Sequence, residues 1–168
     1  MYDEIFNEND MTTLQNLLRN NNKTITTAES CTGGLVAHLI TNISGSSDVF
    51  DGGIISYSNE IKNQELNVKN QTLEKYGAVS VEVVSEMLKG AIKKFNANYA
   101  IAISGIAGPG GGTKNKPVGT VVIGICDDNN NEEIEVFYFD GTRIEIQNKA
   151  AKSSFSKILK FLQKTLDK

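Results

Sequence analysis

The run Thr26–Gly34 places several reactive side chains directly before two glycines. Its members after Ala28 are Glu29, Ser30, Cys31, Thr32, Gly33 and Gly34. A β-branched stretch precedes this run and an amphipathic stretch follows it, so the sequence predicts a strand-to-helix junction, where backbone N–H groups can hold an anion. Ser30 or Thr32 could instead simply cap the helix. Glu29 favours a ligand-binding loop, because a carboxylate at the end of a buried strand needs a partner.

A second group of polar residues could supply a nucleophile and a base. The turn 44–48 contains Ser47, and the segment 56–62 contains Tyr57 and Lys62. Lysine can act as the base of a serine nucleophile if burial lowers its pKa from about 10.4 towards neutrality. The strand expected over 51–57 would span roughly 20 Å, so Ser47 meets Lys62 only if the flanking segments fold back. A solvated surface lysine is the alternative.

A glycine-rich loop follows Ser104 and runs over residues 105–113. Its glycines allow a ligand to approach the backbone closely, but its spacing matches neither the P-loop nor the dinucleotide-binding fingerprint. A flexible hairpin or crossover loop is the alternative. Arg143, at the start of the last expected helix, could clamp a phosphate with two hydrogen bonds or form a surface ion pair.

Composition excludes several classes of function. The chain has 168 residues, a net charge of −3, two cysteines and one histidine. The charge gives no reason to expect nucleic acid or an anionic membrane as a partner, and no apolar stretch is long enough to span a bilayer. His38 alone argues against a His-rich zinc site, so no metal is expected. Two cysteines and an acidic N-terminus without an apolar core predict a cytoplasmic protein without a disulfide framework.

Periodicity predicts one α/β domain over residues 1–168, a three-layer sandwich with a mixed β-sheet flanked by helices. Helices are expected over 4–20, with a break near Asn9, and over 33–43, 59–66, 71–76, 80–95 and 144–166. Strands are expected over 24–28, 51–57, 99–104, 118–126 and 132–139. Two of these strands end at the run Thr26–Gly34 and at the glycine-rich loop, so the sheet would position both loops.

These stretches together resemble the CinA C-terminal domain family, which includes nicotinamide mononucleotide deamidases. The matching segments cover nearly the whole chain in order and are Thr27–Gly34, Gly45–Ser47, Tyr57–Glu60 with Lys62, Gly77–Ser80, Ser104–Pro109 and Lys116–Thr120. The resemblance implies hydrolysis of the carboxamide of nicotinamide mononucleotide to nicotinate mononucleotide and ammonia. It also implies a Ser/Lys mechanism without metal or cofactor, and a homo-oligomer, a dimer or a trimer.

The resemblance also implies a role for each matching residue. The nucleophile matches Ser47 and the base matches Lys62, with Tyr57 and Ser30 close to the pair. Ser104 with the following Gly105, Ala107 and Gly108 matches the substrate-binding loop, and Arg143 matches a basic residue near the substrate. Substrate contacts are also expected from Glu29, Thr32, Gly33 and Gly34. Longer family members carry an N-terminal domain with a metal-dependent pyrophosphatase activity, for which this chain has no room, so that activity is expected to be absent.

Two questions stay open at the level of sequence. Ser30 competes with Ser47 as the nucleophile. The alternative to an amidase is a non-catalytic nucleotide-binding domain with a regulatory role in competence or DNA damage. The acidic balance of the chain argues against direct DNA binding by such a domain.

Overall fold

Five strands form one mixed sheet in the computed structural model, which describes residues 6–166. The spatial order is β2 (Gly53–Ile55), β1 (Ile25–Glu29), β3 (Tyr99–Gly105), β4 (Thr120–Asp127) and β5 (Glu132–Tyr138). The first three strands are parallel, whereas β4 and β5 run antiparallel to their neighbours. The mixed sheet predicted from the sequence is confirmed.

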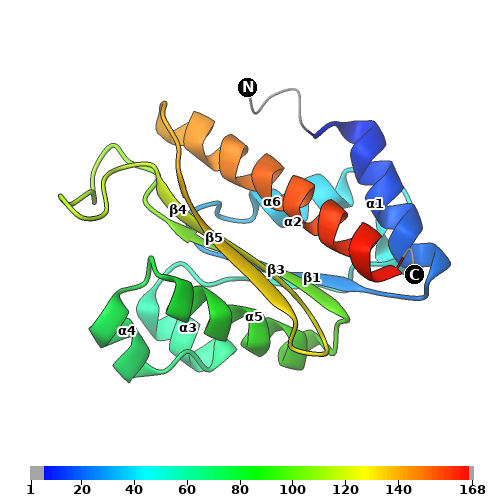
Figure 1. Cartoon of the computed structure of the whole chain (residues 1–168), viewed down its shortest axis with the longest axis horizontal. Helices are drawn as coiled ribbons and strands as arrows, with labels where there is room; N and C mark the ends of the chain where they lie inside the picture. Colours follow the sequence, from blue (N-terminus) through cyan, green and yellow to red (C-terminus); the bar gives the residue numbers. More distant parts are fainter. Residues whose placement is uncertain (1–5, 167–168) are drawn as a thin grey trace.

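Helices cover both faces of this sheet and complete the predicted three-layer sandwich (Figure 1). One face carries α1 (Glu8–Asn20), α2 (Leu35–Thr41) and α6 (Arg143–Leu166). The other carries α3 (Asn59–Leu66), α4 (Asn70–Tyr76) and α5 (Val81–Phe95). None of the helices between residues 6 and 166 has the length and apolar character needed to cross a membrane.

Side-chain alternation along β3 divides the core into two parts. Ile101 and Ile103 belong to the cluster under α1, α2 and α6, whereas Ala100 and Ala102 belong to the cluster under α5. The small side chains on the second face leave room for α5 to lie close to the sheet. Gly124 of β4 shows how close, because a Cβ there would lie 2.7 Å from Val84 Cγ1. The predicted buried strand is therefore confirmed, with a large-residue face and a small-residue face.

Capping side chains fix where three of the helices begin. Asn7 forms a capping box with Asp10, so α1 begins at Glu8 and the expected break near Asn9 is wrong. Ile5, expected on this helix, lies outside the described residues. Ser80 caps α5 as predicted. Ser58 Oγ accepts a hydrogen bond from the backbone N–H of Ile61 at the start of α3, and this cap fixes the first turn of the helix that carries Lys62.

The parallel arrangement of β1, β2 and β3 gathers their carboxyl ends at one edge of the sheet. The loops that leave this edge are 30–34, 56–58 and 106–119. The opposite edge holds the 3₁₀ helix η1 (Ser46–Asp48), since the nearby Val49 carbonyl accepts a hydrogen bond from Ile25 N at the start of β1. The two edges are roughly 15 Å apart, given five residues in β1.

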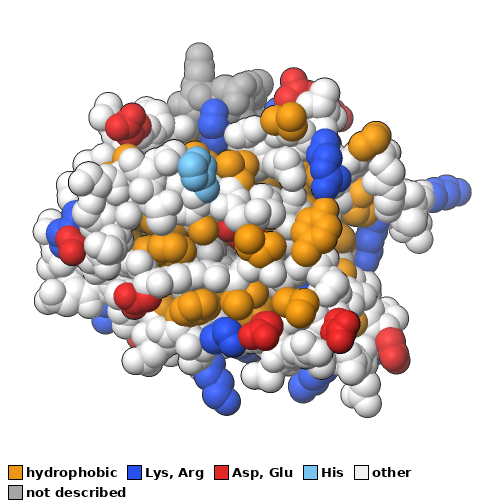
Figure 2. Space-filling model, turned by 180° about the vertical axis from the view of Figure 1, so that it is seen from behind, with side chains coloured by type: hydrophobic (Ala, Val, Ile, Leu, Met, Phe, Trp, Pro, Cys, Tyr) orange, Lys and Arg blue, Asp and Glu red, His pale blue; other side chains and the backbone are white. Residues whose placement is uncertain are grey.

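The surface keeps some apolar side chains exposed. Figure 2 shows hydrophobic side chains lying across the face of the molecule seen from behind, with lysine, arginine and acidic side chains among them. Ile55 and Tyr57 are two of the large hydrophobic residues that remain exposed, at 55% and 60%. Both belong to the segment at the end of β2, next to the edge where the parallel strands end.

Candidate active site

Lys62 and Ser30 meet at the carboxyl end of β1. The Nζ atom of Lys62 donates to Ser30 Oγ at 3.1 Å and to the Ser56 carbonyl oxygen at 2.7 Å. Lys62 is only 1% exposed and Ser30 only 8%. Lys62 is the fourth residue of α3, so the Ser58 cap and the end of β2 together aim its side chain at the loop that follows β1. The alternative of a solvated surface lysine is wrong.

Burial changes the acid–base properties of this lysine. Loss of hydration around the ammonium lowers the pKa of Lys62 from its ordinary value to about 8, against a smaller opposing effect of Cys31. A neutral amine is therefore available to a useful extent near neutral pH, where an ordinary lysine is almost wholly protonated. A neutral Nζ at hydrogen-bond distance from a serine hydroxyl is the arrangement that a general base and its nucleophile require.

The turn that presents Ser30 is held by its own backbone and by β3. Ser30 N donates to the Ile103 carbonyl at 2.9 Å, and Gly33 N donates to the Ser30 carbonyl at 3.0 Å. Gly33 and Gly34 both have positive φ angles, 59° and 103°, which glycine adopts without steric cost. The two glycines therefore shape the turn that places the hydroxyl of Ser30 beside Lys62.

Glu29 has its partners inside the protein. Its carboxylate accepts hydrogen bonds from Thr32 Oγ1 at 2.7 Å, from Val36 N at 2.9 Å and from Ala37 N at 3.0 Å. The side chain thus satisfies N–H groups at the beginning of α2 and joins β1 to that helix. A role for Glu29 and Thr32 in fixing the turn replaces the expected contact with substrate.

A cavity of about 280 Å³ opens beside the Ser30–Lys62 pair. Of the residues predicted from the sequence, it is lined by Ser30, Tyr57, Lys62, Ser104, Gly105, Ala107, Gly108 and Arg143. It therefore brings together the end of β2, the end of β3, the glycine-rich loop and the beginning of α6. The size is near the lower end of the range for pockets that bind small molecules.

Arg143 closes one side of this cavity. Its Nη1 atom donates to the Gly108 carbonyl at 2.7 Å, and its Nη2 atom donates to the hydroxyl of Tyr57 at 2.7 Å. The guanidinium thus ties the glycine-rich loop to the segment after β2, and the alternative of a surface ion pair is wrong. Arg143 and Lys62 give the cavity two cationic side chains.

Ser104 contributes to the cavity from the end of β3. Its side chain is buried, and its Oγ atom donates to the Ala78 carbonyl at 2.8 Å. This bond holds the segment with Ala78 and Val79, which forms an apolar part of the cavity wall. In this structure Ser104 therefore orients the wall while also lining the cavity.

The structure does not bring Ser47 to Lys62. Ser47 is exposed in η1 at the amino edge of the parallel strands, whereas Lys62 lies at their carboxyl edge. The expected pairing of Ser47 with Lys62 is therefore not found. The parallel pairing of β1 with β2 places the residues before and after β2 at opposite edges of the sheet. Glu29, Thr32, Gly33 and Gly34 also lie outside the lining of the cavity.

The cavity also contains residues to which the sequence analysis gave no role in the site. Asn59 lines it and precedes Lys62 by three residues on α3, a spacing that places two side chains on one helical face. Cys31 also lines the cavity, but burial raises the pKa of its thiol to about 12. The protonated thiol argues against Cys31 as a nucleophile.

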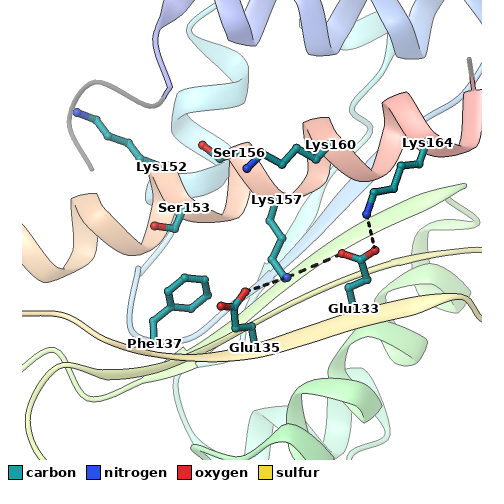
Figure 3. A pocket seen from close by; sticks show the side chains of 9 residues that line it. All are labelled: Glu133, Glu135, Phe137, Lys152, Ser153, Ser156, Lys157, Lys160 and Lys164. Carbon is teal, nitrogen blue, oxygen red and sulfur yellow. Dashed lines mark hydrogen bonds and ion pairs between the residues drawn. The ribbon is translucent and has the colours of Figure 1, made fainter. Parts of the chain in front are cut away.

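A further cavity of about 230 Å³ lies between α6 and β5 (Figure 3). Lys157 forms ion pairs with Glu135 at 3.2 Å and with Glu133 at 3.9 Å, and Lys164 pairs with Glu133 at 3.5 Å. Both glutamates of this cavity are therefore paired with lysines. None of the predicted site residues lines it, so the chemistry is concentrated at the carboxyl edge of the sheet.

Comparison with known proteins connects this chain to one family. The family model described as the CinA C-terminal domain matches residues 7–162. A CinA-like protein of Thermotoga neapolitana is 47% identical over 88% of this chain and 36% of its own length. One from Prochlorococcus marinus is 52% identical over 85% of this chain and 35% of its own length. The chain thus spans about a third of the length of these curated relatives.

Solved structures give the same result. A CinA superfamily protein of Klebsiella pneumoniae superposes with a TM-score of 0.88 at 32% identity, and the match covers 92% of this chain and 96% of that protein. The competence/damage inducible protein CihA of Agrobacterium tumefaciens superposes with a TM-score of 0.84 at 38% identity over the same shares. The likeness extends over almost the whole of the described fold.

Proposed function

Because the chain belongs to the CinA C-terminal domain family, we propose that it is an amidase that hydrolyses the carboxamide of nicotinamide mononucleotide. The products are nicotinate mononucleotide and ammonia. One observation carries the proposal: the buried Nζ atom of Lys62 lies 3.1 Å from Ser30 Oγ, beside a cavity with a second cation. Ser30 takes the part of nucleophile that the sequence resemblance had given to Ser47.

In the first half of the reaction, neutral Lys62 accepts the proton of Ser30 as Oγ attacks the carboxamide carbon. The tetrahedral intermediate carries its negative charge on the former carbonyl oxygen, where backbone N–H groups of the surrounding loops stabilise it. Protonated Lys62 then gives its proton to the amide nitrogen, the C–N bond breaks, and ammonia leaves. The acyl group stays on Ser30 as an ester.

In the second half, Lys62 is neutral again and takes a proton from a water molecule. The resulting hydroxide attacks the ester carbon, Ser30 leaves with the proton returned from Lys62, and nicotinate mononucleotide is released. Each half-reaction returns Lys62 to the neutral form, so the chain needs no other proton carrier. A mechanism with a single proton carrier fits this site, because Lys62 is the only basic group within hydrogen-bond distance of Ser30 Oγ among the described contacts.

The substrate would lie along the cavity with its carboxamide at Ser30. The positively charged pyridine ring makes the carboxamide carbon more electrophilic and, next to Lys62, disfavours the protonated amine. Ala78 and Val79 offer an apolar surface to the ring. The glycine-rich loop and Arg143 offer backbone N–H groups and a guanidinium to the phosphate.

Ammonia release from nicotinamide mononucleotide tests the proposal, with nicotinate mononucleotide identified by chromatography. Wild-type protein should release both products in equal amounts. Lys62→Met, which keeps an aliphatic chain in the buried position, should reduce turnover by at least about 1000-fold. Binding of the mononucleotide by calorimetry without any product from wild-type protein would instead identify a non-catalytic nucleotide-binding domain.

A further inference from the structure

Gln147 connects α6 to the turn that carries Ser30. Its Nε2 atom donates to the Cys31 carbonyl oxygen at 2.9 Å, and its side chain is partly buried. Gln147 follows Arg143 by four residues, so the two side chains leave the same face of the helix. The first two turns of α6 therefore reach both the nucleophile turn and the cavity wall.

The bond from Gln147 completes the fixation of the backbone around Ser30. The Ser30 N–H is held by β3 and the Ser30 carbonyl is held by Gly33 N, while Gln147 holds the next carbonyl along the chain. Because each peptide unit is planar, three successive anchors leave the backbone at Ser30 little freedom to rotate. The direction of the Ser30 side chain then depends on all three.

The same helix also holds the parts of the cavity that would contact substrate. Arg143 binds the Gly108 carbonyl and the Tyr57 hydroxyl. Gln147 and Arg143 thus attach the turn that carries Ser30 and the wall of the cavity to the same helix, α6. A nucleophile displaced by about 1 Å relative to the bound carboxamide can lose about 100-fold in rate. Attachment to one helix therefore affects catalysis, because it fixes the distance between Ser30 and the substrate.

We propose that Gln147 is a positioning residue, which keeps Ser30 Oγ aligned with both Lys62 Nζ and the substrate carbonyl by holding the Cys31 carbonyl. The inference rests on the proposed function, because it gives Gln147 the role of orienting the proposed nucleophile, Ser30. Gln147 itself does not line the cavity, so it acts through the backbone and does not touch the reacting atoms.

The test compares Gln147→Ala with wild type in two assays. In the first, kcat for ammonia release from nicotinamide mononucleotide should fall about 10- to 100-fold, with KM changed less than about threefold. In the second, a fluorophosphonate probe should label Ser30 more slowly by a similar factor. The probe reacts when Ser30 Oγ attacks phosphorus, the P–F bond breaks, fluoride leaves and Lys62 takes the serine proton.

Variants at the same and the next position separate positioning from general stability. Gln147→Arg keeps an N–H donor within reach of the Cys31 carbonyl and should recover most of the lost rate, whereas Gln147→Glu cannot donate and should not. Asn148→Ala is the matched control, because the Asn148 amide binds only the Ile144 carbonyl of its own helix among the described contacts. It should stay within twofold of wild type in both assays.

The two assays also keep the inference distinct from the proposed substrate. If wild-type protein releases no ammonia but the probe labels Ser30, the substrate is wrong and the labelling rates still decide the role of Gln147. Labelling and kcat within twofold of wild type in Gln147→Ala would overturn the inference. So would a change in KM alone, a lowered thermal midpoint without a fall in labelling rate, or the absence of labelling at Ser30 in wild-type protein.

Discussion

At the scale of single residues, the site depends on what burial does to Lys62. A lysine that is 1% exposed is rare because its charge loses hydration, and here that loss lowers the pKa to about 8. Its two hydrogen bonds among residues 6–166 lead to a serine hydroxyl and a backbone carbonyl, and neither partner is a carboxylate that would hold the proton in place. The surroundings of Lys62 therefore favour a base over a structural cation.

The pH dependence of the reaction follows from this pKa. Only the neutral form of Lys62 can accept the serine proton, and that form predominates above the pKa of about 8. We predict that kcat/KM for ammonia release rises about tenfold per pH unit below pH 8 and levels off above it. A profile measured from pH 6 to 9.5 checks this, and constant kcat/KM between pH 6 and 8 would contradict it.

Some residues that the sequence analysis assigned to one site lie together in the structure. Tyr57, Lys62 and Arg143 were expected at the site, and all three line the cavity. Glu29 was expected there because a buried carboxylate needs a partner. That argument was sound, but the partner is α2. Sequence cannot distinguish a ligand from a helix N-terminus, since both offer N–H groups.

At the scale of elements, helix patterns were easier to predict than strand ends. α3 has the bounds that were expected, 59–66, and its Ser58 cap is visible in the sequence. β2 covers only Gly53–Ile55, in place of the expected 51–57. The following residues leave the sheet, and Tyr57 points to Arg143. Tyr57 has a residue type common in strands, but here it lines the cavity. Periodicity alone does not distinguish these two roles.

The close contact of α5 with β4 gives an element-scale prediction. A Cβ at Gly124 would lie 2.7 Å from Val84 Cγ1 and 2.9 Å from Leu88 Cδ1. Gly124→Val should therefore force α5 away from the sheet and lower the free energy of unfolding by about 1–3 kcal/mol. Urea unfolding measures this, with Gly110→Ala as the control because a Cβ there meets no atom within 4 Å. Equal stability of Gly124→Val and wild type would contradict the packing.

At the scale of the whole molecule, topology decides which serine lies beside Lys62. The three-layer α/β architecture could be predicted because helical and strand periodicities alternate along the chain. The order of the strands and the parallel pairing of β1 with β2 could not, since both depend on contacts far apart in sequence. With β1 and β2 parallel, the turn before β2 and the helix after it fall at opposite edges. Ser30, at the end of β1, then shares its edge with Lys62.

All the groups of the proposed site come from the described part of this one chain. Ser30, Lys62, Tyr57 and Arg143 belong to four segments that converge at the carboxyl edge of the sheet. The chain spans about a third of the length of its curated relatives, so the site is contained in the portion that they share with it. We therefore expect the amidase activity to reside in this domain.

The most direct test of the account compares two serine variants in the same ammonia-release assay with nicotinamide mononucleotide. Ser30→Ala removes the hydroxyl at 3.1 Å from Lys62 Nζ, whereas Ser47→Ala changes an exposed residue at the other edge of the sheet. The account predicts at least about a 1000-fold loss of kcat in Ser30→Ala and a change of less than twofold in Ser47→Ala. Full activity of Ser30→Ala together with loss of activity in Ser47→Ala would contradict it.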